Sequence, residues 1–371
     1  MKKCIVGVIV AVMMLQLTLS VDASEISSNE QSTALTAQDE MGNGTSGLQG
    51  ESQQMYGTEL STTIDVSTLS ELVNAAKDSQ YTTINVMSDM TATKASADVT
   101  YAIRVIGGKT INMNSHKITA GAGVKYIVRV DKDVANVKIK DGTLEKGGIF
   151  LQGNNSQTSV SNVTINNAPE NALYIVGSHE VSVDSCNFKN VVGEGIYATN
   201  SKLAKLNNIT TTGCKNAISL KGGSVVNGIT NCDLSGFSGN GLNLYAGISL
   251  SGKIDHNKIV AASRTKTRAI NIVNASGTVV ISNNTMSNCY NGVFVDSSTV
   301  SEITANTISS VDDHAITLSG ATCNGVIGQN ILSSFKKYGI NIYGGSKVQQ
   351  PIQNNKITGA SKTSSAVRGI C

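Results

Sequence analysis

The polar side chains best suited to acid–base chemistry lie in the C-terminal third of the chain. Asp313 and His314 are adjacent, and Asp296 lies a short distance before them. Two carboxylates about 6.5–9.5 Å apart can hydrolyse a glycosidic bond with inversion, because one protonates the leaving oxygen while the other activates a water molecule. We expect Asp296 and Asp313 to form such a catalytic pair.

The same part of the chain contains the residue types that a different reaction needs. A lyase or an epimerase uses a base to remove the proton beside a uronate carboxylate, a cation to neutralise that carboxylate, and a proton donor. His314, Arg268 and Tyr338 are of these three types. The alternative is that they are a chance selection from a polar surface, and the sequence leaves that alternative open.

The sequence gives little reason to expect a metal ion or another cofactor. Asp296 and Asp312 could hold calcium, but they come without the ligand-rich loop that calcium sites use. No phosphate-binding glycine loop, zinc spacing or Ser-His-Asp signature stands out. We therefore expect no cofactor and no metal site, with calcium as the alternative.

Aromatic residues recur at a regular spacing along the chain. Phe150, Tyr174 and Tyr197 follow one another at intervals of 24 and 23 residues. Tyr245 and Tyr343 occur in similar local sequences further on. Exposed aromatic rings offer flat apolar faces to sugar rings, so we expect these five residues to bind substrate. The alternative is that stacked aromatic rings only stabilise a sheet.

A long repeat accounts for these spacings. The pattern apolar-x-x-(Asn or Cys)-x-apolar recurs every 21 to 27 residues, and it begins at Val134, Val160, Val183, Ala204, Ile229, Ile254, Ile281, Ile303, Ile327 and Ile352. A second strand, apolar-x-apolar, follows in most repeats, as in Leu173-Tyr174-Ile175. Because strand side chains alternate, its outer two residues point inward and the middle one outward. Each repeat is then one turn of an all-β parallel solenoid, in which like residues form columns.

The fourth position of the pattern predicts one inward column, which reads Cys186, Asn207, Cys232, Asn257, Asn284, Asn306, Asn330 and Asn355. An inward Asn can satisfy backbone groups and the Asn residues above and below it. Cys186 and Cys232 are two rungs apart, about 9.6 Å at about 4.8 Å per rung, which is beyond the reach of a disulfide. We expect mostly buried free thiols, although six cysteines in an exported chain would also allow a disulfide framework.

The N-terminal part of the chain indicates export. Lys2 and Lys3 precede an apolar stretch from Ile5 to Leu19 and the small-residue site ending at Ala23, so residues 1–23 are expected to be a signal peptide. A membrane anchor is the alternative, but the stretch is shorter than the ~20 residues that span a bilayer. Residues 24–60 are polar and should form a flexible leader. We expect a secreted, extracellular protein with no membrane span after signal removal.

Residues 61–371 should form the β-helix, with a short capping helix at its start. Thr68 and Glu71 have capping-box spacing, and Leu69, Leu72, Val73 and Ala76 share one helical face. A β-helix exposes a strand edge at each end, and this helix would cover the first edge. The sequence stops at Gly369-Ile370-Cys371, where another strand would start. We expect a missing continuation, a partner or end-to-end self-association there.

The charge of the chain does not favour nucleic acid as a partner. The net charge is +3, from 29 Lys and Arg against 26 Asp and Glu, and no run of basic residues is present. Binding to nucleic acid depends on neutralising phosphates with basic residues. We therefore expect no nucleic-acid partner.

The layout of about residues 65–371 resembles the pectate-lyase-like superfamily of right-handed parallel β-helices, which includes pectate lyases, polygalacturonases, alginate epimerases and NosD-like proteins. The stretch Lys109–Ile118 is similar to the L-D-L-N-G-H-x-I segment near the start of such helices. The resemblance implies that polysaccharides, especially uronic-acid polymers, bind along an exposed face. It shows architecture better than chemistry, since one fold hosts many functions.

Two segments are similar to catalytic segments of this superfamily. Asp312-Asp313-His314-Ala315-Ile316 matches the Asp-Asp pair of polygalacturonases, whose Asn-Thr-Asp, Gly-His-Gly and Arg-Ile-Lys segments are missing here. Ile254-Asp255-His256-Asn257 looks similar to a pectate lyase segment, but the Arg-x-Pro-x-x-Arg of those enzymes is absent. The alternative for Asp255 and His256 is a solvated pair at a repeat turn.

Two functions therefore remain. The first is a secreted β-helix that binds or modifies a polysaccharide or cell-surface glycan along one exposed face. If it is an enzyme, it is a polysaccharide lyase, an epimerase or a glycoside hydrolase. The second is a non-catalytic, adhesin-like surface solenoid.

Overall fold

The computed structural model describes residues 62–359 and 368–371. The expected signal peptide, residues 1–23, and the expected leader, residues 24–60, lie outside the described residues. Within the described part of the chain, no helix is long and apolar enough to cross a membrane.

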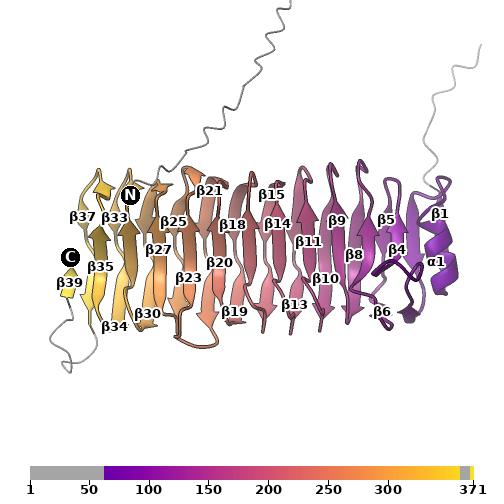
Figure 1. Cartoon of the computed structure of the whole chain (residues 1–371), viewed down its shortest axis with the longest axis horizontal. Coiled ribbons are helices and arrows are strands. Elements are labelled where there is room, and N and C mark those ends of the chain that lie inside the picture. Colours follow the sequence, from indigo (N-terminus) through magenta and orange to yellow (C-terminus); the bar gives the residue numbers. More distant parts are fainter. Residues whose placement is uncertain (1–61, 360–367) are drawn as a thin grey trace, which may run out of the picture. The chain divides into compact units, whose positions relative to one another are not determined.

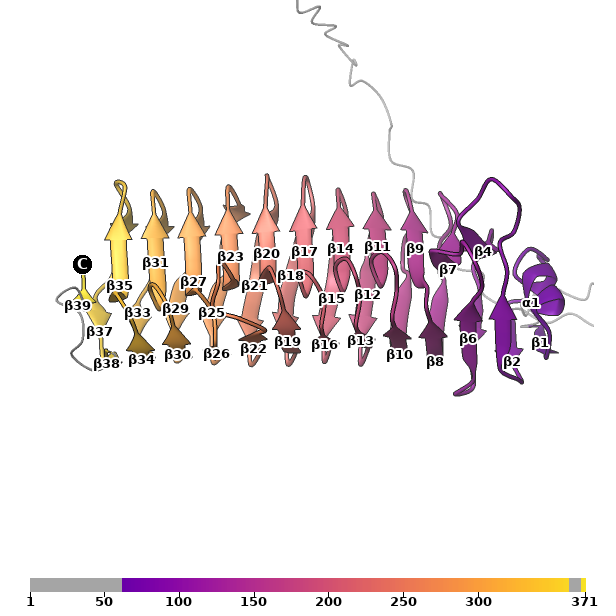
Figure 2. The same ribbon diagram turned by 60° about the horizontal axis from the view of Figure 1, so that its bottom comes forward.

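The described residues form stacked coils of parallel strands, as the repeat predicts (Figures 1 and 2). One sheet runs along the whole stack and contains 12 strands, one from each coil. Its strands are β4 (Tyr101–Val105), β7 (Tyr126–Val130), β9 (Gly148–Gln152), β11 (Leu173–Val176), β14 (Ile196–Thr199), β17 (Ile218–Lys221), β20 (Asn240–Tyr245), β23 (Arg268–Val273), β27 (Asn291–Asp296), β31 (Ile316–Ser319), β35 (Tyr338–Tyr343) and β39 (Arg368–Ile370).

The remaining strands close the coils on the other sides. A 24-stranded sheet contains β1 (Thr63–Val66), β2 (Thr83–Val86), β3 (Met90–Ala92), β5 (Thr110–Asn112), β6 (Lys117–Ala120), β8 (Lys138–Glu145), β10 (Ser159–Asn166), β12 (Val181–Asp184), β13 (Asn187–Lys189), β15 (Lys202–Asn207), β16 (Thr210–Thr212), β18 (Val225–Thr230), β19 (Asp233–Phe237), β21 (Ser249–Asp255), β22 (Lys258–Ala261), β24 (Ser276–Gly277), β25 (Val280–Ser282), β26 (Thr285–Ser287), β29 (Glu302–Thr304), β30 (Thr307–Val311), β33 (Ile327–Gly328), β34 (Ile331–Phe335), β37 (Ile352–Gln353) and β38 (Lys356–Thr358). A small three-stranded sheet contains β28 (Thr299–Val300), β32 (Thr322–Cys323) and β36 (Lys347–Val348).

The register of the 12-stranded sheet confirms the second strand of the repeat. Leu173 pairs with Ile196, and Tyr174 pairs with both Phe150 and Tyr197. The apolar residues on either side of Tyr174 are fully buried, whereas the tyrosine is only partly covered. The alternation of the strand therefore separates a continuous apolar core from an outer face, and like residues stack along the sheet.

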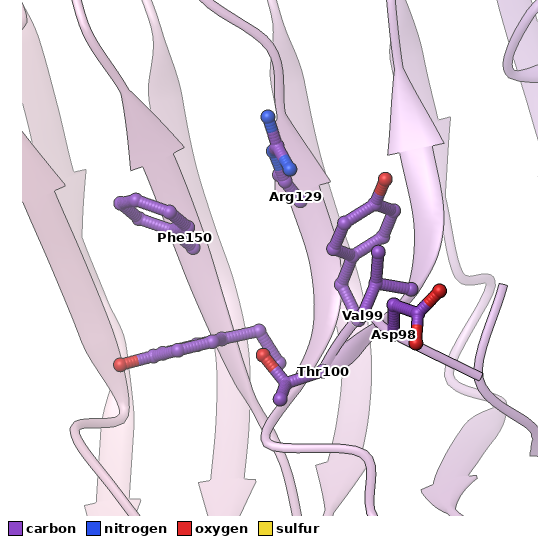
Figure 3. Close-up of a pocket in the computed structure, with 7 residues that line it drawn as sticks. Asp98, Val99, Thr100, Arg129 and Phe150 are labelled. Atoms are coloured by element: carbon purple, nitrogen blue, oxygen red, sulfur yellow. The ribbon is translucent and has the colours of Figure 1, made fainter. Parts of the chain in front are cut away.

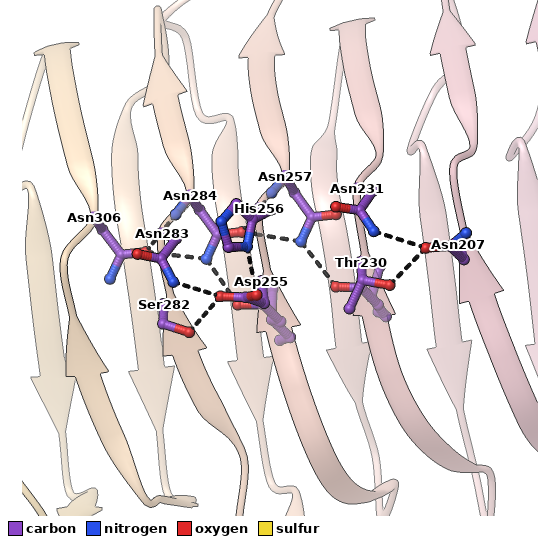
Figure 4. A network of polar contacts seen from close by, with 12 residues as sticks. Asn207, Thr230, Asn231, Asp255, His256, Asn257, Ser282, Asn283, Asn284 and Asn306 are labelled. Carbon is purple, nitrogen blue, oxygen red and sulfur yellow. Dashed lines mark hydrogen bonds and ion pairs between the residues drawn. The ribbon is translucent and has the colours of Figure 1, made fainter.

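The inward column of asparagines is also confirmed from Asn257 onward (Figure 4). Asn284 donates from its main-chain nitrogen and from Nδ2 to Oδ1 of Asn306, at 3.1 and 3.0 Å. Its Nδ2 also donates to the main-chain oxygen of Ile254 at 2.8 Å. The same arrangement joins Asn257 to Asn284. Each buried amide thus satisfies backbone groups at a turn that has no strand partner for them.

A left-handed residue precedes each of these inward positions and makes the turn. Asn231 has φ of 56°, His256 of 54° and Asn283 of 54°. Asn tolerates this conformation better than most residues, because its short side chain bonds locally. The abundance of Asn in the sequence therefore has two causes, a buried column and a column of turns beside it.

Two of the expected repeat starts are wrong. The register pairs Val160 with Ile139, not with a position at Val134, and pairs Val183 with Leu206, not with Ala204. Consequently Ile209 is the buried residue between the rungs of Cys186 and Cys232, and Asn207 lies outside, bonded to Asp184. A register shift beside Val181 adds one residue to β15, and the repeat of this coil begins at Leu206, two residues after Ala204.

The expected capping helix is present as α1 (Leu69–Ala75). Oγ1 of Thr68 accepts from the nitrogen of Glu71 at 3.3 Å, and Oε2 of Glu71 accepts from the nitrogen of Thr68 at 3.1 Å. Leu72 and Ala75 are buried against the first coil. The helix packs on β1, β2, β3 and β4, at the end of the stack opposite β39 (Figure 1).

The described cysteines are free thiols, as expected. Cys186, Cys214, Cys232, Cys289 and Cys323 are buried, and Cys371 is exposed. Burial raises the pKa of Cys186, Cys232 and Cys289 to about 12. These side chains therefore act as small apolar residues of the core.

Candidate functional site

The ten predicted site residues all lie on or beside strands of the 12-stranded sheet. Its register arranges them in three rows that run along the stack on the outer face. The middle row contains Phe150, Tyr174 and Tyr197. A second row, two residues further along each strand, contains Tyr245, Asp296 and Tyr343. A third row, near the strand starts, contains Arg268, His314 and Tyr338, with Asp313 directly before His314.

The middle row begins with stacked aromatic rings. The ring centroids of Phe150 and Tyr174 are 4.9 Å apart, with planes inclined by 12°. Those of Tyr174 and Tyr197 are 5.4 Å apart and inclined by 51°. All three side chains are only partly buried. The strand spacing brings the rings into contact, and their outer surfaces form an apolar strip on an otherwise polar face.

Lys221 and Tyr245 extend this strip. Nζ of Lys221 lies 5.2 Å from the ring centroid of Tyr197, a cation–π contact. The hydroxyl of Tyr197 raises the pKa of Lys221, so the ammonium is firmly charged. Tyr245 pairs with Lys221 across the strands, and burial raises the pKa of its hydroxyl. A cation thus lies between two tyrosines at the end of the aromatic row.

The structure adds residues at the other end of the strip that the sequence reasoning missed. The ring of Tyr126 lies 5.5 Å from Phe150, and the guanidinium of Arg129 lies 4.8 Å from the ring centroid of Tyr101. With residues 98–100 they line a cleft of about 250 Å³ (Figure 3). The signal was present as two matching segments, Tyr-Ala-Ile-Arg-Val and Tyr-Ile-Val-Arg-Val, which start at Tyr101 and Tyr126.

The third row brings together the polar group around Asp313. Nζ of Lys337 lies 2.7 Å from Oδ1 of Asp313, and Nε2 of His314 lies 3.5 Å from Oδ2. Asn291 donates to Oδ2 at 3.3 Å. The ring of Tyr338 packs on His314 with centroids 4.9 Å apart. Asp313 and His314 are only 8% and 9% exposed, so little of this carboxylate and imidazole is accessible to solvent.

Burial favours the neutral form of the His314 imidazole. Burial lowers its pKa, and although Asp313 opposes this effect, Lys337 adds to it. Its Nδ1 is buried and has no hydrogen-bond partner among the described residues. The neutral imidazole is the form of histidine that can accept a proton, which a base requires.

Arg268 lies two rungs before His314 in the third row and reaches across the sheet. Its guanidinium carbon is 3.6 Å from the ring centroid of Phe294, and its Nη1 donates to Asn271 at 2.6 Å. Burial lowers its pKa, and Asp296 and Asp313 both act in the opposite direction. The side chain therefore covers this part of the middle row and supplies a positive charge beside both carboxylates.

The register does not support the expected pairing of Asp296 with Asp313. The register places Asp296 opposite Ser319, at the far end of β31 from Asp313. The four residues of β31 alone span about 10 Å, because a strand rises about 3.3 Å per residue. The two carboxylates therefore belong to different rows. The register does not favour the carboxylate separation of an inverting glycosidase.

The alternative calcium site at Asp296 and Asp312 has no support in the structure. Oδ1 of Asp312 lies 2.9 Å from Nζ of Lys336 and 3.5 Å from Nη1 of Arg264. Among the described residues, no group of three or more Asp, Glu, His or Cys side chains is arranged to hold a metal ion. The charge of Asp312 is balanced by protein cations.

The Asp255–His256 segment is a structural turn (Figure 4). Oδ1 of Asp255 accepts from Ser282 at 2.6 Å and from Asn283 at 2.8 Å, and Oδ2 contacts Nδ1 of His256. Burial alone raises the pKa of Asp255, but these three hydrogen bonds outweigh it and lower the pKa. The carboxylate therefore joins two coils, which agrees with the interpretation of Asp255 and His256 as a pair at a repeat turn.

The comparison with known families agrees with this architecture. The family model described as "Right handed beta helix region" matches residues 147–306 and 216–369, which is more than half of the chain. The chain belongs to the right-handed β-helix family. A second model, described as "Putative pectate lyase-like adhesive domain", matches residues 63–195 of this β-helix. No curated protein matches this chain.

The solved structures that are similar to this β-helix include two with TM-scores above 0.5. One is the catalytic domain of a GH87 α-1,3-glucanase in complex with tetrasaccharides, with 12% identity, a TM-score of 0.55, and coverage of 84% of this chain and 68% of that chain. The other is a double mutant of the periplasmic alginate epimerase AlgG, with 11% identity, a TM-score of 0.51, and coverage of 83% and 84%. At such identities the likeness shows the fold alone.

Proposed function

We propose that this protein binds polysaccharide along the outer face of its 12-stranded sheet. The observation that carries the proposal is the row of stacked, partly exposed rings of Phe150, Tyr174 and Tyr197, with Lys221 at its end. Such a strip offers apolar faces to successive sugar rings, and the ammonium of Lys221 can pair with a carboxylate or a hydroxyl. The similar folds of an α-1,3-glucanase and an alginate epimerase suggest glucans and uronate polymers as ligands to test.

Binding is tested by calorimetric titration with oligosaccharides of α-1,3-glucan, alginate and polygalacturonate. Tyr174→Ala should lower the affinity for the bound class about tenfold, since a lost stacking contact of about 1.4 kcal/mol has that effect. Ile331→Ala is the matched control, because Ile331 is also an exposed apolar residue but belongs to the 24-stranded sheet. Absence of binding to all three classes, or equal losses in both variants, would refute the proposal.

Modification of a bound uronate is the second candidate, and the group around Asp313 favours it. His314 would act as the base, Tyr338 as the proton donor, and Arg268 or Lys337 as the cation that neutralises the uronate carboxylate. Lyase activity is measured by the absorbance of unsaturated products, epimerase activity by the change in uronate composition, and hydrolase activity by reducing ends. An adhesin-like protein would bind without any of these changes, and the adhesive-domain match over residues 63–195 supports that reading.

We also propose that the protein acts outside the cell after removal of residues 1–23. The basic residues, apolar stretch and small-residue site at the N-terminus support this proposal. N-terminal sequencing of protein recovered from the medium or the cell surface would test it. A start at Met1 in that material would contradict it.

A further inference from the structure

We propose that the cleft between residues 98–100 and Phe150 is a terminal subsite, which holds the last sugar residue of a glycan and makes recognition depend on a chain end. This inference rests on the proposed glycan binding, because it concerns one end of the same aromatic row. This terminal cleft is the space lined by Asp98, Val99, Thr100, Tyr101, Tyr126, Arg129 and Phe150.

The outer face ends at the terminal cleft. β4 is the first strand of the 12-stranded sheet, and α1 packs against it. The segment between β3 and β4 is fixed beside the cleft, since the oxygen of Thr100 accepts from the nitrogens of Lys125 and Tyr126 at 2.7 and 3.1 Å. Figure 3 shows Val99 and Asp98 on the side of Arg129 away from Phe150. A glycan that follows the aromatic row therefore meets a wall here.

The walls of the terminal cleft are aromatic on the side that joins the row. Tyr126 contacts Phe150 at 5.5 Å and Tyr174 at 6.2 Å between ring centroids. The three rings are in contact, with Phe150 and Tyr174 partly exposed and Tyr126 only 9% exposed, so a sugar in the cleft would be followed directly by sugars on Tyr174 and Tyr197. This continuity identifies the cleft as the end of the row and not as a separate site.

The polar groups of the cleft suit the hydroxyls of a terminal sugar. Arg104 and Arg129 both pair with Asp131, which leaves one of their two positive charges without a carboxylate in that cluster. Nε of Arg129 is buried and has no hydrogen-bond partner among the described residues. Asp98 provides an exposed carboxylate on the opposite wall. A pyranose offers both acceptors for the arginine and donors for the carboxylate.

The size of the cleft limits its occupant. Its volume of about 250 Å³ is below the roughly 300–1,000 Å³ of pockets that hold drug-sized ligands. One sugar ring is the unit that matches this volume, and a second ring would have to lie on Tyr174. The geometry thus separates one terminal position from the open positions that follow it.

The first test is stoichiometry. Fractions of the oligosaccharide class that binds, with mean lengths that differ threefold, are titrated with the full chain, and the number of proteins bound per glycan is measured at saturation. Recognition of an end predicts the same number, one, for both lengths. A number that rises in proportion to length overturns the inference while leaving the proposed binding intact.

The second test fills the cleft. Val99→Trp places a large ring between the walls from a partly exposed loop position, and Asp98→Asn removes the carboxylate without changing size. Both should weaken binding of short oligosaccharides at least tenfold, whereas Ile331→Ala should not. If Val99→Trp and Asp98→Asn bind like the unmodified protein while Tyr174→Ala is weakened, the inference fails and the proposed function stands. If the unmodified protein binds none of the probes, both fail.

Discussion

Nζ of Lys337 lies 2.7 Å from Oδ1 of Asp313, and this ion pair holds a nearly buried carboxylate just before the start of β31. The preceding pair provides a natural comparison, because Lys336 lies 2.9 Å from the more exposed Asp312. Removing the partner of a buried charge is costly, whereas removing the partner of an exposed one is nearly neutral. The two adjacent lysines therefore have different expected effects.

Lys337→Met should lower the free energy of unfolding by about 1–2 kcal/mol, a value discounted because the lysine itself is half exposed. Lys336→Met should change it by less than about 0.5 kcal/mol. Thermal unfolding of both variants followed by circular dichroism measures the difference. Equal midpoints for the two variants would show that Asp313 does not depend on Lys337.

The pH dependence of stability should report His314. Burial makes the pKa of His314 in the folded chain lower than its ordinary value of 6.5. At a pH between the folded and the ordinary pKa, the unfolded chain binds a proton that the folded chain does not. Stability from this residue is therefore complete above about pH 6.5 and is lost as the pH falls through the window below it. The thermal midpoint of the unmodified protein should fall more between pH 7 and pH 5 than that of His314→Gln. Parallel curves would contradict the burial effect.

Tyr174→Phe separates stacking from hydrogen bonding in the aromatic row. If sugar rings stack on the exposed faces, Phe should retain affinity within about threefold and Ala should lose about tenfold, because only Ala removes the ring. Titration with the oligosaccharide class that binds gives both values. A loss in Tyr174→Phe as large as that in Tyr174→Ala would assign the contribution to the hydroxyl.

Asn284→Ala should destabilise the solenoid by about 2–4 kcal/mol, since it leaves the buried nitrogen of Asn257 and the oxygen of Ile254 without partners. Asn227→Ala is the control, because Asn227 is exposed on β18. Thermal midpoints of the two variants, measured under the same conditions, test the prediction. A midpoint for Asn284→Ala close to that of the control would mean that the column contributes little.

Alkylation should distinguish the thiols. In the native protein, iodoacetamide should modify Cys371 and leave Cys186, Cys214, Cys232, Cys289 and Cys323 unmodified, because burial raises their pKa values to about 11 or 12. Peptide mass spectrometry locates the labels, and denatured protein is the positive control. Rapid native labelling of Cys232 would place it at an accessible surface.

Local patterns were enough to predict most of the fold. The outer residues of Leu173-Tyr174-Ile175 point inward in any strand, so the core, the outer face and the aromatic row follow from alternation alone. Thr68 and Glu71 likewise formed the predicted capping box, because both partners lie within one helical turn. The same reasoning failed at Asn207, where a bulge changed which residue faces the core.

The amino-acid sequence by itself determined which residues share a face of a strand, because that depends only on neighbours along the chain. Only the tertiary structure decided which residues of successive coils lie opposite each other, since turn lengths and bulges differ from coil to coil. That register separated Asp296 from Asp313, joined Lys337 to Asp313, and placed residues 98–100 against Arg129 and Phe150. Contacts between coils arise from packing across the stack, which no single repeat encodes.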